Sequence, residues 1–240
     1  MLEDKNISNI LFLDIETVPA EPSFDKLSDS MQAFWDKKSK TLRSDEETAA
    51  DVYEKAGIYA EFGKIVCISV GFITTAPNGE SVIRTKSFAG DDEQLILKHF
   101  ATLITRSYNR HDSSLCGHNI KEFDVPFIAR RMLINGIQLP NILNIAGKKP
   151  WEINFVDTME LWKFGDYKNF TSLNLLTHIF GIPTPKDDID GSQVAHVYYA
   201  ENDIARIATY CEKDVVATAQ LFLRYQLKPL IKPENIIHID

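Results

Sequence analysis

The sequence predicts an α/β fold, and three features of its apolar pattern indicate this. An apolar run at 10–13 leads directly into acidic residues, as in a buried strand in the middle of a sheet. A strand-like run at 64–75 is joined to a looser one at 81–88 by Asn78-Gly79, a dipeptide that favours hairpin turns. Elsewhere, apolar residues recur at helical spacing. We therefore expect a sheet covered by helices, with the second and third strands antiparallel.

The composition is that of an ordinary globular protein. Of the 240 residues, 44% are apolar and 25% are charged, which is ample material for a core. The 26 basic and 34 acidic residues give a net charge of −8, which argues against a broad basic surface that coats duplex nucleic acid. An enzyme that grips a few phosphates locally and binds metal ions in an acidic cleft stays open. No linker rich in Pro, Gly or Ser marks a boundary, so we expect one domain over residues 1–240.

The three cysteines, Cys67, Cys116 and Cys211, lie far apart and form no CxxC or Cys/His pattern. They fit a reducing cytosol better than a disulfide framework or a zinc site. The first residues are charged and lack the apolar core of a signal peptide, and no run approaches ~18 apolar residues. We therefore expect a cytoplasmic protein that does not interact with a membrane.

A polar stretch at about 19–61 follows the first strand. Its larger apolar side chains come at roughly helical spacing, and they are Phe24, Leu27, Met31, Phe34 and Trp35. We expect a helical insertion here that packs this aromatic stripe onto the body. A role as a substrate flap is the less favoured alternative.

The rest of the chain alternates helices with short strands. A helix is expected at about 92–106 with Asp91 or Asp92 as its cap, another at 121–135, and a long final helix at about 202–225. The other expected elements are a strand at 113–118, a strand at 153–156, a short helix through Trp162, a helix that begins at Thr171-Ser172 and stops at Gly181, and a loop at 186–191.

Asp14 and Glu16 stand at the end of the first strand. Side chains alternate across a strand, so both carboxylates share one face. Two carboxylates this close repel each other and are tolerable chiefly if a cation lies between them. Two acids in a surface loop are the alternative on this stretch alone.

Two further acids have distinctive neighbours. Asp124 lies just past the strand expected at 113–118, where the next helix starts. Tyr210 and Asp214 lie four residues apart in the final helix and so share one face of it. A phenol beside a carboxylate is suited to holding a water molecule near a metal ion and orienting it for attack.

In this order and in these contexts, the acids resemble the motifs of the DEDD superfamily of 3′–5′ exonucleases, in the DEDDy branch whose last motif carries a tyrosine. The motifs are Asp14-Ile-Glu16, Asn119-x-x-x-Phe123-Asp124 and Tyr210-x-x-x-Asp214. The stretches at 60–69 and 185–192 look like those of a bacterial family of predicted exonucleases related to the proofreading domain of family-B DNA polymerases. The resemblance covers nearly the whole chain.

The resemblance implies a ribonuclease-H-like three-layer fold, with a five-stranded mixed sheet, the first strand central and helices on both faces. It also implies a 3′–5′ exonuclease that hydrolyses phosphodiester bonds from the 3′ end of single-stranded DNA and releases nucleoside 5′-monophosphates. Because 240 residues leave no room for a polymerase, we expect the chain to act alone or with a polymerase or repair partner in trans.

Two divalent ions follow from the same resemblance. Hard oxygen ligands suit Mg²⁺, with Mn²⁺ as a substitute, better than zinc. Asp14 would bridge both ions, Glu16 and Asp214 would hold the ion that activates water, and Asp124 would support the other. Tyr210 would orient the attacking water. Without ions the four carboxylates would repel one another, so we expect divalent ions to stabilise the fold.

Several residues are candidates for contacts with the substrate, whose last base is expected to stack in a cleft rather than to be recognised by sequence. They are Thr17, His118, Asn119, Phe123, Arg130, Arg131 and Lys186. A solvated surface charge is an equal alternative for the three basic residues, and a structural hydrogen-bonding role is the alternative for His118. The other acids nearby are expected to cap loops, and they are Asp157, Asp187, Asp188 and Asp190.

Two alternatives to the DNA exonuclease stay open. An exoribonuclease would use the same site, because discrimination by the 2′-hydroxyl cannot be derived from these residues. A catalytically idle nucleic-acid-binding module on the same fold is favoured by the acidic composition, but it has no chemical reason to keep all four acids and the tyrosine. A nucleotide-binding α/β protein is excluded, because the sequence has no GxGxxG or GxxxxGK[ST] loop.

Overall fold

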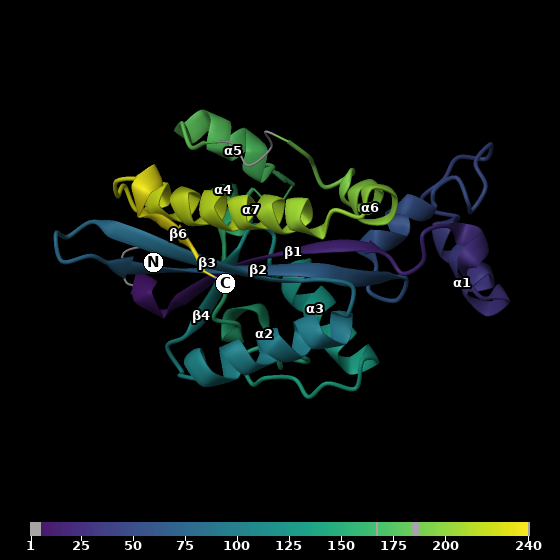
Figure 1. The fold of residues 1–240 in the computed structure, drawn as a ribbon, viewed down its shortest axis with the longest axis horizontal. Helices are drawn as coiled ribbons and strands as arrows, with labels where there is room; N and C mark the ends of the chain where they lie inside the picture. The colour runs from purple at the N-terminus through teal and green to yellow at the C-terminus, as the bar shows by residue number, and fades with distance from the viewer. Residues whose placement is uncertain (1–5, 167, 184–187, 240) are drawn as a thin grey trace.

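A mixed sheet lies between two layers of helices in the structure, which is a computed structural model (Figure 1). Helix α7 (Ile204–Tyr225) covers one face, and helices α2 (Glu93–Ser107) and α3 (Asp124–Ile134) cover the other. This is the three-layer α/β arrangement that the sequence predicts. The structure describes residues 6–166, 168–183 and 188–239.

The first strand, β1 (Ile10–Pro19), is central, as expected. It pairs antiparallel with β2 (Gly63–Thr75) and parallel with β4 (Ser114–Gly117). The predicted hairpin is confirmed, since β2 pairs antiparallel with β3 (Ser81–Ala89) and the turn residue Gly79 has a φ of 84°.

Among the residues that the structure describes, the sheet has six strands in the order β5-β4-β1-β2-β3-β6, so the expectation of five was one too few. Strand β5 (Val156–Asp157) lies beside β4, later and shorter than predicted. The additional strand is β6 (Ile236–His238), which pairs parallel with β3 at the far edge. Three residues near the end of the chain carry too little periodicity to indicate a strand.

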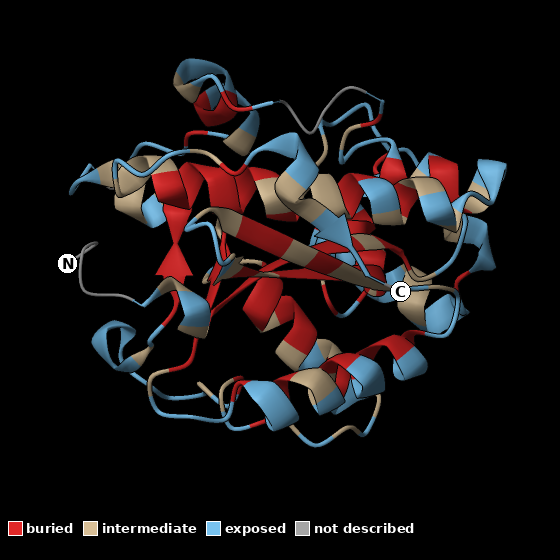
Figure 2. Cartoon of the chain, turned by 60° about the vertical axis from the view of Figure 1, so that its left-hand side comes forward, coloured by how far each residue is buried: buried red, intermediate tan, exposed pale blue. Residues whose placement is uncertain are grey.

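Both faces of β1 are buried, and its alternating side chains enter two separate cores. Leu11 and Leu13 pack with α2 and α3, whereas Ile10 and Phe12 pack with α7. Figure 2 shows the buried residues on the sheet and on the helix sides that face it. Helix α7 lies very close to β2, because a Cβ on Gly71 would come within 2.8 Å of a Val215 methyl group.

The stretch after β1 contains helix α1 (Asp29–Ser39) and short 3₁₀ turns. Its core is Trp35, which is fully buried, packs edge-on against Tyr53 and donates its indole N–H to the carbonyl of Ala49 at 2.9 Å. The predicted stripe is wrong at one position, since Phe34 is 61% exposed. It lies one residue before Trp35, about 100° around the helix, and so falls outside the buried face.

Most helix boundaries follow the capping residues. Asp92 caps α2 by accepting the N–H of Leu95 at 3.0 Å, and Ser172 caps α5 (Leu173–Phe180) in the same way. Helix α4 (Thr158–Lys163) ends close to the predicted point. The short helix α6 (Val194–His196) and the π-helical turn after it were not predicted. No helix in the described part of the chain is long and apolar enough to cross a membrane.

Candidate active site

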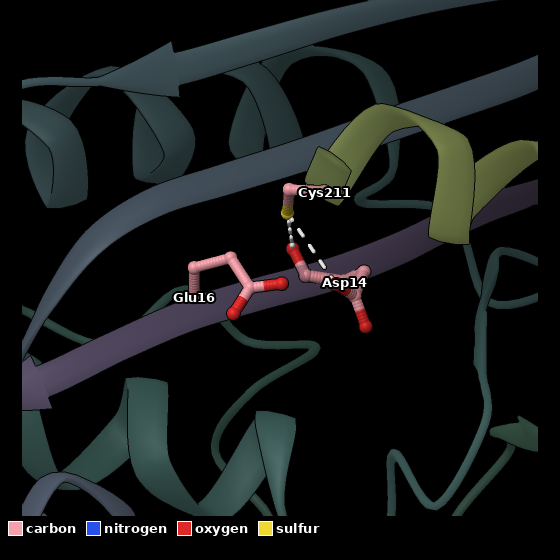
Figure 3. A group of neighbouring side chains, drawn as sticks. All are labelled: Asp14, Glu16 and Cys211. Atoms are coloured by element: carbon pink, nitrogen blue, oxygen red, sulfur yellow. Dashed lines mark hydrogen bonds between the residues drawn. The ribbon is translucent and has the colours of Figure 1, made fainter. Parts of the chain in front are cut away.

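Asp14 and Glu16 extend from β1 on the side of the sheet that α7 covers (Figure 3). Ile15 between them packs in the opposite core, so the predicted alternation is confirmed. One ligand atom from each of Asp14, Glu16 and Cys211 lies within 4.8 Å of the other two. The surface-loop alternative is excluded, because β1 continues to Pro19 and Glu16 is only 8% exposed.

Asp124 reaches the same place from the other layer of helices. It is the first residue of α3, which begins three residues later than predicted, after a turn in which Asn119 adopts a left-handed conformation with a φ of 69°. The Asp124 carboxylate is almost fully buried and accepts a hydrogen bond from the backbone of Ile15, next to Asp14. Burial raises the pKa of Asp124 to about 7, and the carboxylates of Asp157 and Asp214 act in the same direction.

Asp214 and Tyr210 come from α7. The Tyr210 ring is buried in a core with Val18 and Ile207, which holds it in place. Burial and the carboxylates of Asp214, Glu16 and Asp14 raise the pKa of the Tyr210 phenol well above its usual range. The phenol therefore keeps its proton at neutral pH.

The structure thus brings all four acids of the predicted motifs together. Burial raises the pKa of Asp14 far above its usual range, and the carboxylates of Asp214, Asp124 and Glu16 raise it further. Asp14 and Asp124 have raised pKa values, and a divalent cation that replaces their protons would relieve the repulsion within the cluster. The donor set therefore fits hard ions such as Mg²⁺ or Mn²⁺.

His118 connects separate segments of the fold through its side chain. Its ring nitrogens lie 2.9 Å from the Thr158 hydroxyl and 2.9 Å from the carbonyl of Thr171. Burial lowers the pKa of His118, so the ring is neutral at pH 7 and joins β4 to two later segments. Because both ring nitrogens have partners within the protein, the structure favours the structural alternative for His118 over a contact with the substrate.

The Arg131 side chain likewise makes its hydrogen bonds within the protein. Its guanidinium donates to both oxygens of Glu93, at 2.8 and 2.5 Å, and to the carbonyl of Ala60. This buried pair ties α3 to α2, so Arg131 is not available to bind a phosphate. Arg130 is exposed, and Lys186 lies outside the described residues.

The remaining substrate candidates lie next to the acids. Thr17 follows an irregularity in the β1–β2 pairing directly after Glu16, and it is half-buried. Asn119 is half-buried at the turn before α3. Phe123 packs against Phe127 with ring centroids 5.6 Å apart and is also half-buried.

Asp157 caps helix α4 and also binds the backbone of the turn before α3. It accepts N–H groups from Met159 and Glu160 at the start of α4, and also from Asn119 and Lys121. Capping is also confirmed for Asp190, which accepts the N–H of Ser192. Asp188 instead pairs with Arg206 at 2.7 Å, and Asp187 lies outside the described residues.

Two residues of the site carry no motif of their own. Cys211 follows Tyr210 on α7, and the sequence gives it no neighbour that indicates a role in the site. Asp157 stands between a strand and a helix, which predicts a cap but not its reach to the turn at Asn119. Both act through contacts with residues that are distant in the chain, and a single sequence does not reveal such contacts.

A similarity of fold links the chain to the family B DNA polymerase from the hyperthermophilic archaeon Pyrobaculum calidifontis. The TM-score is 0.51 and the sequence identity is 14%. The similarity covers 91% of this chain and 24% of the polymerase, so the chain spans about a quarter of that protein. No curated protein matches.

A protein family described as predicted 3′–5′ exonucleases related to the exonuclease domain of PolB matches residues 58–230. The matched segment includes Asp124, Tyr210 and Asp214 but not Asp14 or Glu16, which the fold of β1 brings to the same cluster. The match covers well over half of the 240 residues. The chain therefore belongs to the family of predicted 3′–5′ exonucleases related to the exonuclease domain of PolB.

Proposed function

We propose that this chain trims single-stranded DNA from its 3′ end, hydrolysing one phosphodiester bond at a time with two divalent ions and releasing nucleoside 5′-monophosphates. The strongest support is the convergence of carboxylates from β1, α3 and α7 around Asp14, with the Tyr210 phenol beside them. These residues are separated by up to 200 positions in the sequence, so their convergence depends on the whole fold.

Asp14, Glu16, Asp124 and Asp214 would hold two Mg²⁺ or Mn²⁺ ions. Such ions supply charge stabilisation to the attacking and leaving oxygens of a phosphodiester. The pKa of Asp14 responds to each of the other three acids, which suits a carboxylate shared between both ions. Glu16 and Asp214 would then hold the ion on the water side, and Asp124 would support the other.

Tyr210 would orient the attacking water. A neutral phenol can donate one hydrogen bond and accept another, so it can fix a water molecule without taking its proton. The buried ring is held by the core around Val18 and Ile207, which gives the hydroxyl a defined position. Orientation of this kind lowers the entropic part of the barrier.

The substrate would enter as a single strand with its last base near Phe123. An aromatic ring supported by a second one, here Phe127, offers a stacking surface that every base can use. Thr17 and Asn119 would contact the terminal nucleotide, and Arg130 would contact a phosphate. The acidic net charge fits contact with a few phosphates better than coverage of a duplex.

Matched single-stranded DNA and RNA oligonucleotides test the substrate and the product. With Mg²⁺ or Mn²⁺, DNA is expected to yield nucleoside 5′-monophosphates, identified by chromatography, and RNA to be degraded more slowly. Degradation of RNA alone would keep the site and change the substrate to RNA. If neither polymer is cut while Mn²⁺ still binds, the chain is an idle binding module and the proposal fails.

A further inference from the structure

Cys211 contacts Asp14 from the side of α7. Its sulfur lies 3.4 Å from the backbone carbonyl oxygen of Asp14 and 3.4 Å from the carboxylate Oδ2 (Figure 3). The backbone carbonyl oxygen only accepts hydrogen bonds, and the carboxylate oxygen only accepts when it is ionised, as it would be when it holds a metal ion, so the thiol is the donor. Cys211 belongs to none of the predicted motifs.

A row of polar side chains in contact with one another extends from Cys211, between helix α7 and strands β2 and β3. In order it contains Cys67, Ser69, Ser87 and Glu212. The Cys211 thiol contacts that of Cys67, the Cys67 sulfur lies 3.5 Å from the Ser69 hydroxyl, and the two serine hydroxyls lie 2.7 Å apart. Ser87 donates to Glu212 at 2.7 Å, and Thr85 donates to the same carboxylate at 2.9 Å.

The direction of each hydrogen bond follows from the two carboxylates at the ends. Glu212 only accepts, so the single hydroxyl hydrogen of Ser87 points at it and Ser69 must donate to Ser87. The oxygen of Ser69 is then left to accept from Cys67. Cys211, at the other end, directs its hydrogen to Asp14, because a carboxylate is a far better acceptor than a thiol sulfur.

We infer that Cys211 is a positioning residue, whose thiol holds the Asp14 carboxylate in the orientation that binds divalent ions. This inference rests on the proposed function, in which Asp14 is shared by both ions. Partners that hydrogen-bond to a metal ligand orient it, and their loss typically weakens metal binding 10- to 100-fold.

A thiol suits this task because it is a weak donor. A basic side chain at the same place would neutralise Asp14 and compete with the ions for its charge. The thiol restrains Oδ2 and leaves most of the negative charge for a metal. Cys211 is fully buried, and so is Cys67 behind it.

Mn²⁺ binding, measured by calorimetry, tests the inference without any need for catalysis. Cys211→Ala is expected to weaken binding about tenfold. Cys211→Ser keeps a donor and is expected to stay within about threefold of the wild type. Cys116→Ala is the control for loss of a buried thiol, because Cys116 packs in the separate core around Phe12 and Phe222, and it should bind Mn²⁺ as the wild type does.

Two results would overturn the inference. If Cys211→Ala binds Mn²⁺ as tightly as the wild type, the thiol does not position Asp14. If Cys211→Ser falls as far as Cys211→Ala, the side chain acts through its volume and not through its hydrogen.

A second measurement serves if Cys211→Ala does not fold. The infrared S–H stretching band of Cys211, assigned by its absence in Cys211→Ser, should move to higher frequency in Asp14→Asn, because the anionic acceptor is lost. An unchanged band would refute the hydrogen bond to the carboxylate, because it would show that the thiol donates to the Asp14 backbone carbonyl, which the substitution keeps. Failure of the proposed function is a different result: the wild type would bind Mn²⁺ in a Cys211-dependent manner and yet cut no nucleic acid.

Discussion

Asp157 accepts the backbone N–H of Asn119 at 3.0 Å and so fixes the left-handed turn that precedes Asp124. The same carboxylate caps α4. One buried side chain therefore joins the end of β5 to the loop that orients an acid of the candidate active site. Its effect on the site is indirect, since it holds backbone and not substrate.

Asp157→Ala is expected to lower the free energy of unfolding by about 3 kcal/mol, because four partly buried N–H groups lose their acceptor. Urea denaturation monitored by circular dichroism measures this loss. Asp157→Asn keeps one oxygen and should lose about half as much. A loss below about 1 kcal/mol for the alanine variant would show that water replaces the carboxylate at this turn.

Arg131 and Arg130 are adjacent and should behave oppositely. Arg131→Ala leaves Glu93 buried without its cation and is expected to cost about 3 kcal/mol of stability. Arg130→Ala should change stability by less than about 0.5 kcal/mol. It should instead weaken binding of single-stranded DNA and flatten its salt dependence. Equal stability of the two variants in urea would contradict the structural role of Arg131.

The stability of the ion-free protein should fall as the pH rises. The pKa of Asp124 is raised from 3.8 to about 7 in the fold, and that of Asp14 is also raised. Protonation of these groups favours the folded state fully below pH about 4, and this contribution is lost as the pH rises through about 7. In chelator, the melting temperature should therefore be lower at pH 8 than at pH 6, and Mn²⁺ should reverse the difference.

Asp124→Asn supplies the control for this prediction. It removes one titrating carboxylate, so the pH dependence in chelator should become shallower. A melting temperature in chelator that is the same at both pH values, or that Mn²⁺ does not raise at pH 8, would contradict the electrostatic account of the cluster.

Tyr210→Phe should separate metal binding from water orientation. The ring and its packing remain, so the affinity for Mn²⁺ should stay within about twofold. Loss of the hydroxyl should lower kcat about 100-fold, as for loss of one oriented hydrogen-bonding group. Steady-state kinetics and calorimetry measure the two effects, and a fall in Mn²⁺ affinity that accounts for the whole loss in rate would contradict this role.

The sequence predicts the layers and the central strand well, because each follows from local periodicity and from residues with defined turn or capping chemistry. Asn78-Gly79 and Asp92 are examples, since each fixes its own neighbourhood. The strand β6 and the late start of α3 were not predicted. They depend on pairing with β3 and on the turn held by Asp157, which are contacts between distant segments.

The residues of the candidate site also fall into two groups, those that the local sequence identifies and those that depend on contacts between distant segments. Asp14, Glu16, Asp124, Tyr210 and Asp214 were identified from motifs, and the fold brings them together. For Arg131 the sequence leaves a phosphate contact and a solvated charge open, because a basic residue beside a motif does not reveal that Glu93 lies within 2.5 Å of it. Cys211 was overlooked for the same reason, since its partner is Asp14, 197 residues away.

The central claim is that the acid cluster removes nucleotides from a 3′ end, and a 5′-labelled single-stranded DNA tests it most directly. The wild type is compared with Asp14→Asn and with Asp45→Asn, which makes the same change at an exposed acid of the stretch after β1. With Mg²⁺, the wild type and Asp45→Asn should produce a ladder that shortens from the 3′ end. Asp14→Asn, or the wild type in chelator, should leave the DNA intact. Internal cuts, immediate release of the labelled nucleotide, or an active Asp14→Asn variant would contradict the account.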